Sequence, residues 1–195
     1  MEQSEQVTNT NPGYWPSVGI AALIFGFIYF IISLIGGYMT INAEPTGSMF
    51  GSISQAVTGV AGCLIAAFGG MLAVWHYSRT YGITLKMGKG ALIGLYVGIG
   101  IAVIMTLLSQ IWELIDPSYT NRLMESMIAN YEAIEGMPEA QRQQVIDGVY
   151  SQFQESSTLW GIIKGMLFVA VPVGILNLLT GMLGVSMFAR EKESA

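Results

Sequence analysis

The sequence has little charge, one cysteine and one histidine. Of its 195 residues, 11% are Asp, Glu, Lys or Arg, and eight basic residues stand against thirteen acidic ones, for a formal net charge of −5. This acidic balance argues against nucleic-acid binding through a basic surface. A single cysteine excludes an internal disulfide framework, and a single histidine excludes sites that need two, such as H-E-x-x-H. We therefore expect no metal site, no cofactor and no nucleic-acid partner.

Apolar residues and glycine are abundant instead: 52% of the chain is hydrophobic, and it contains 24 glycines. A helix needs about 20 mostly apolar residues to cross roughly 30 Å of hydrocarbon, because its backbone groups must be bonded internally. Four long stretches between consecutive charges meet this need, and they predict spans at residues 18–39, 53–77, 88–112 and 159–188, with Lys89 and Lys164 near the starts of the last two. The predicted fold is an all-α membrane protein, a bundle of four transmembrane helices.

The first span resembles a signal peptide only superficially. Its apolar run is longer than the usual 7–15 residues, and no Lys or Arg precedes it. We interpret it as a retained helix. One transmembrane domain is then expected over 14–190, between a disordered cytoplasmic tail at 1–13 and a short cytoplasmic tail at 191–195.

Basic residues predict the orientation of the spans, because they concentrate in cytoplasmic loops. The connection over 113–158 has two arginines against eight carboxylates, a local net charge of −6. The opposite side holds five basic residues, namely Arg79, Lys86, Lys89, Arg190 and Lys192. We expect both termini in the cytoplasm, with the chain in the cytoplasmic membrane.

Small residues form a stripe along the third span, where Gly90, Gly94, Gly98 and Ala102 recur every four residues. Helices in lipid associate through close packing, which small residues allow. The stripe predicts either a contact between helices of one chain, which we favour, or a homodimer face.

Polar residues and a proline interrupt the fourth span. Pro172 should kink the helix, and Asn177 should either bond to a neighbouring helix or, with Pro172, line a shallow cavity. Lys164 lies about five residues inside the span, where an unpaired ammonium is costly. It could pair with Glu113 at the end of the third span, or extend to the lipid head groups.

The connection over 113–158 is too long to be structureless and has a helical pattern. Apolar residues recur every four positions from Tyr119 to Tyr131, Gly136 and Pro138 break the pattern, and a second amphipathic run ends near Phe153. We predict an acidic, extracytoplasmic helical hairpin that either caps the bundle or binds a partner. Alternatively, its second arm continues into the fourth span as one long helix.

A family resemblance follows from two motifs and the layout between them. These are Ile-Thr-Leu at 83–85 and, after the glycines of the third span, Ile-Asp-Pro-Ser-Tyr at 115–119. Together with the Met- and Glu-containing hairpin, the pattern over 14–190 resembles an uncharacterised family of bacterial four-span membrane proteins, a domain of unknown function. The resemblance implies four spans with an insertion between the third and fourth, and no activity.

The residues also bear on the class of function. The spans lack G-x-S-x-G and paired aspartates, so we expect no catalytic residues and no enzyme. They hold few ionisable groups, which transport paths usually need. The sequence favours a non-enzymatic scaffold or accessory subunit that contacts lipids and a membrane-protein partner or a second copy. The alternative is solute or lipid handling through a cavity near Lys164, Pro172 and Asn177.

Overall fold

The computed structural model describes residues 13–47 and 53–189. The predicted tail 191–195, and all but the last residue of the tail 1–13, lie outside this range. Every regular element in the described range is helical. Four segments are long and apolar enough to cross a membrane, which confirms the predicted all-helical, four-span fold: Trp15–Ile41, Ala56–Tyr81, Met87–Ile115 and Leu159–Ala189.

Three of the spans are continuous helices: α1 (Trp15–Ile41), α4 (Met87–Ile115) and α7 (Leu159–Gly184), which continues as the π-helical turn η1 (Val185–Ala189). Pro16 stands in the first turn of α1, where its missing N–H costs nothing. The core lies where α4 and α7 cross, around the fully buried side chains of Val97, Ile101 and Val173.

The second span is divided into α2 (Ile53–Ala66) and α3 (Gly69–Tyr81). The sequence predicted one uninterrupted helix here, so this break is a correction. Gly82 then ends α3 in the left-handed conformation, with φ of 63°, and its N–H donates to the carbonyl of Ser78.

Two further helices, α5 (Tyr119–Glu132) and α6 (Glu139–Ser156), stand between α4 and α7. They pack against each other through Ile128, Ile146 and Val149. Gly136, with φ of 75°, lies in the turn between them. Thr158 caps the start of α7 by accepting a 3.0 Å hydrogen bond from the Gly161 N–H, so α6 and α7 are separate helices.

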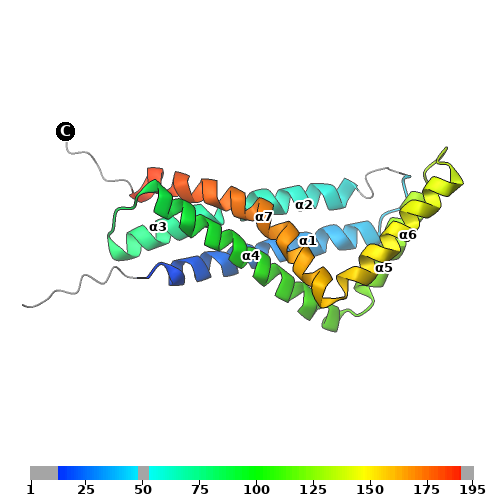
Figure 1. The fold of residues 1–195 in the computed structure, drawn as a ribbon, viewed down its shortest axis with the longest axis horizontal. Coiled ribbons are helices and arrows are strands. Elements are labelled where there is room, and N and C mark those ends of the chain that lie inside the picture. Colours follow the sequence, from blue (N-terminus) through cyan, green and yellow to red (C-terminus); the bar gives the residue numbers. More distant parts are fainter. Residues whose placement is uncertain (1–12, 48–52, 190–195) are drawn as a thin grey trace, which may run out of the picture.

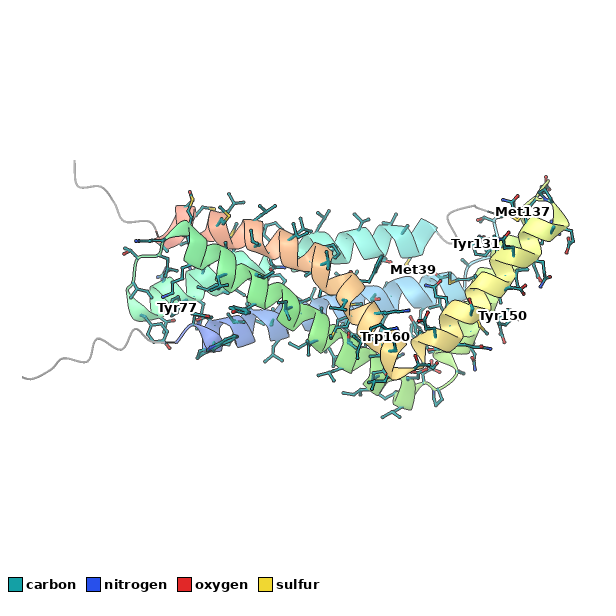
Figure 2. All side chains as sticks on the ribbon, in the orientation of Figure 1. Met39, Tyr77, Tyr131, Met137, Tyr150 and Trp160 are labelled. Atoms are coloured by element: carbon teal, nitrogen blue, oxygen red, sulfur yellow. The ribbon has the colours of Figure 1, made fainter. Side chains whose placement is uncertain are left out.

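We call α5 and α6 together the arm. Figure 1 shows the arm projecting obliquely from one end of the bundle, the arm end, while the start of α1 and the turn η1 lie at the other, the terminal end. In Figure 2, Tyr131 and Met137 lie near the outer tip of the arm, and Tyr77 lies at the terminal end.

Candidate functional site

A polar cluster joins the arm to α1. Asp116, in the turn between α4 and α5, accepts hydrogen bonds from Tyr38 Oη at 2.7 Å and Ser118 Oγ at 2.8 Å, and it forms an ion pair with Arg122. The bond from Tyr38, followed by the bond from Ser118, lowers the pKa of Asp116 below its ordinary value. The carboxylate therefore stays charged and holds α1 and α5 together.

The contact between α1 and α5 continues along both helices. Ser126 Oγ donates to the carbonyl of Thr40 at 2.7 Å, and Tyr119 lies so close to Gly37 that a Cβ there would fall 1.8 Å from its hydroxyl. Burial raises the pKa of Tyr119, so this phenol stays neutral. We call the contacts that Asp116, Tyr119 and Ser126 make with α1 the clamp.

The segment after α1 extends the attachment. Asn130 Oδ1 accepts a 3.1 Å hydrogen bond from the backbone N–H of Thr46. A Cβ at Gly47, where φ is 64°, would meet the carbonyl oxygen of Ala133 at 2.5 Å, so the backbone here lies directly against the end of α5. The arm is thus fixed to the bundle over most of the length of α5.

A cavity of about 340 Å³ lies beneath the clamp. Its walls come from α1, α2, α4, α5 and the end of α6 and mix hydroxyl groups with aromatic rings. The described residues that line it are Tyr29, Phe30, Ser33, Leu34, Thr58, Gly59, Ser109, Gln110, Trp112, Glu113, Tyr119, Thr120, Leu123, Ser156 and Ser157. Glu113 is the one carboxylate among these residues. Within the described residues, no three His, Cys, Asp or Glu side chains are grouped as a metal site requires.

Lys164 does not pair with Glu113, contrary to one of our expectations. Its Nζ lies 2.5 Å from Glu155 Oε1, and both side chains are about half exposed. The reason is the short turn at residues 157–158, which places the last turn of α6 beside the second turn of α7. Glu113 lines the cavity instead and has no ion pair among the described residues.

Asn177 is fully buried and bridges the break in the second span. Its Nδ2 donates to the carbonyl of Ala66 at 3.1 Å, and its Oδ1 accepts from the N–H of Gly70 at 2.6 Å. In an unbroken helix, these two backbone groups would bond to each other. The amide of Asn177 is therefore inserted where the helical ladder lacks the bond between these two groups.

Thr180 completes this bridge by donating to the carbonyl of Ala67. Backbone groups freed inside a membrane must find partners within the protein, and the α7 side chains supply them.

With 0% exposure, Asn177 does not line the cavity expected around it, and Pro172 is exposed. Lys164 lies thirteen residues before Asn177, roughly 20 Å along the helix, so the three residues do not share a site.

The glycine stripe of α4 faces α7 of the same chain. A Cβ at Gly94 would lie 1.9 Å from the Asn177 carbonyl oxygen, and one at Gly98 would lie 2.5 Å from the Cα of Gly174. Gly90 meets Gly181 and Val185 in the same way, and Ala102 is fully buried. These contacts leave no room for side chains between the two helices.

Sequence reasoning missed the clamp and the break. The Asp-Pro-Ser run at 116–118 directly after a span could have indicated the first, because Asp and Ser cap and close turns there. The Gly-Gly pair at 69–70 could have indicated the second, since such pairs are common sites of helix kinks.

These features define a multi-pass membrane protein with four helical spans and a helical arm between the third and fourth. The chain belongs to the family described as "Protein of unknown function (DUF4199)", which it matches over residues 20–184. No curated protein and no solved structure matches the chain.

Proposed function

We propose that this chain is a non-enzymatic scaffold or accessory subunit of a membrane assembly, and that the arm is its docking element. The clamp is the observation that carries the proposal, because it fixes α5 to α1 through charged and neutral hydrogen bonds. The helix α6 then stands at a set angle with only Ile146 and Val149 buried. A rigid, largely uncovered helix loses little conformational entropy when a partner binds.

The polar groups within the spans favour this class over an enzyme. Thr40 and Thr106 donate to backbone carbonyls one turn earlier, and Asn177 and Thr180 support the broken second span. These groups serve packing, whereas hydrolysis within the membrane needs an activated nucleophile or a pair of carboxylates.

Transport has weaker support than scaffolding. A path through the bundle usually presents ionisable groups near the middle of the membrane. In the core, the glycine contacts of α4 and α7 close the space where the alternative placed a cavity.

The distribution of charge supports an orientation with both chain ends in the cytoplasm of a bacterial cell. Arg79, Lys86 and Lys89 lie at the terminal end, around the connection between α3 and α4. At the arm end, Arg122 is paired with Asp116 and Arg142 with Glu139. With Arg190 and Lys192, which follow η1 in the sequence, Arg79, Lys86 and Lys89 outnumber the three basic residues of the arm end, which supports the terminal end as the cytoplasmic side.

Site-specific photocrosslinking in native membranes tests the docking role. Tyr150, 44% exposed on the outer side of α6 (Figure 2), is replaced by p-benzoylphenylalanine, and Phe168, 82% exposed on α7, serves as the matched aromatic control. We expect one discrete protein adduct from position 150, either a second copy or one stoichiometric partner, and none from position 168. The variant Asp116→Ala, which loosens the clamp, should lower the yield. The same adducts from both positions, or no protein adduct from position 150, would contradict the proposal.

A further inference from the structure

The cavity under the clamp contains a carboxylate without a counter-charge. Glu113 lines it, and no Lys or Arg is among the described residues of its walls. The three basic side chains of the described arm end are already paired: Arg122 with Asp116, Arg142 with Glu139 and Lys164 with Glu155. A half-buried carboxylate at the end of a membrane span is stabilised by a cation, and the described part of the chain supplies none.

The walls around Glu113 suit an organic cation. Four aromatic side chains line the cavity, namely Tyr29, Phe30, Trp112 and Tyr119. Aromatic faces attract ammonium groups, and they do so more strongly where water is excluded. The other polar groups of the walls are hydroxyls and one amide, whose oxygens accept hydrogen bonds from an amine.

The helix α7 lies outside the described walls of the cavity. None of the described lining residues belongs to α7, and the first half of α7, residues 159–171, has no buried residue. Residues of this half, such as Leu167 and Phe168, face outward. A volume of about 340 Å³ is at the low end of the range for small-ligand sites, so it fits a head group better than a whole lipid.

We propose that this cavity binds the ammonium head group of an amphiphile, with Glu113 as the counter-charge and the apolar chain leaving toward α7. The amphiphile is either an amine-bearing membrane phospholipid or a free cationic amphiphile. This inference goes beyond the scaffold role and does not depend on it, because α6 takes part in the cavity only through Ser156 and the arm's outer face takes no part.

Native mass spectrometry of the full chain released from maltoside micelles tests the proposal with three probes. These are phosphatidylethanolamine, dodecylammonium and the anionic lipid phosphatidylglycerol. We expect one bound molecule per chain for an amine probe and at least tenfold weaker binding of phosphatidylglycerol. Binding of phosphatidylethanolamine assigns the site to a membrane lipid, and binding of dodecylammonium alone assigns it to a free amphiphile.

Two variants locate the binding. Glu113→Gln should weaken binding of the amine probe at least tenfold, while the matched control Glu125→Gln, exposed on α5, should not. Gly59→Leu adds an apolar side chain to the cavity wall at a position where the Cβ itself meets nothing within 4 Å, and Gly19→Leu on α1, where the Cβ is equally free, is its control. Equal binding of phosphatidylglycerol, or undiminished binding by folded Gly59→Leu and Glu113→Gln proteins, would overturn the proposal. If no protein adduct forms from position 150 but the amine probe still binds, the scaffold role is rejected and the proposed cavity site is not.

Discussion

Substituting alanine for Gly94 tests how tightly the fourth span is held. The added Cβ would lie 1.9 Å from the carbonyl oxygen of Asn177, whereas ordinary contact begins at 3.4 Å. The helices α4 and α7 must therefore part by about 1.5 Å at this point. Because the obstructing atom belongs to backbone, no side-chain rotation relieves the clash.

The energetic consequence is large for one methyl group. Overpacking a tight core costs about 1–3 kcal/mol, and we expect about 3 kcal/mol for Gly94→Ala since both contacting groups are helical backbone. Separation of the helices also pulls Asn177 away from Gly70 and Ala66, whose backbone groups it bonds. The greater helix propensity of alanine recovers at most about 1 kcal/mol.

Unfolding in mixed micelles of maltoside and sodium dodecyl sulfate, followed by circular dichroism, measures the effect. The matched control is Gly165→Ala in α7, where a Cβ meets nothing within 4 Å. We expect Gly94→Ala to unfold at a clearly lower dodecyl sulfate fraction, and Gly165→Ala to unfold at or above that of the parent chain. Coincident curves for the two variants would refute the packing described for α4 and α7.

Three further predictions concern polar groups. Asn177→Leu removes the bridge between Ala66 and Gly70 and should lower the free energy of unfolding by about 1 kcal/mol in the same assay. The loss is no larger because the N–H of Gly70 can then bond directly to the carbonyl of Ala66. An unchanged unfolding midpoint would refute the bridge. Asp116, whose pKa is lowered in the fold, stabilises the arm above the ordinary aspartate pKa of about 4, and this contribution is lost as pH falls through the lowered value. Lowering the pH below about 4 should therefore speed protease cleavage of the arm in the parent chain, and it should do so less in Asp116→Asn. Equal acceleration in the two proteins would refute the clamp. A double-mutant cycle should give a coupling of about 0.5 kcal/mol for Lys164 with Glu155 and none for Lys164 with Glu113; the reverse order would contradict the observed pair.

The sequence predicts the spans because crossing a bilayer imposes a local requirement. Runs without charge located all four, and the break at Gly136 and Pro138 located the two helices of the arm. Observed helix ends differ by a few residues, as at α1 (Trp15–Ile41 against 18–39).

The division of the second span lies beyond local reasoning. It depends on Asn177, more than a hundred residues away, entering the ladder between Ala66 and Gly70. An asparagine in a span predicts a hydrogen bond but does not identify its partner, since any helix of the bundle could supply the partner group.

The pairing of Lys164 with Glu113, one of the two alternatives that the sequence left open, is not observed for a geometric reason. Glu113 lies at a suitable depth in the membrane, but depth alone does not decide which carboxylate lies next to the ammonium of Lys164. The short turn after Ser156 brings Glu155 to the lysine, and sequence pattern does not give the angle of such a turn. The cavity was missed similarly, because its walls come from five helices distant in sequence.

Cysteine labelling in intact cells tests the arrangement of the arm and the terminal end across the membrane. In a Cys63→Ser background, one cysteine is placed at Gln143 on the exposed face of α6 and another, separately, at Thr80 near the end of α3. A membrane-impermeant maleimide should label position 143 in intact cells and position 80 only after permeabilisation. Labelling of both positions under the same condition would contradict a bundle whose arm and terminal end face opposite sides.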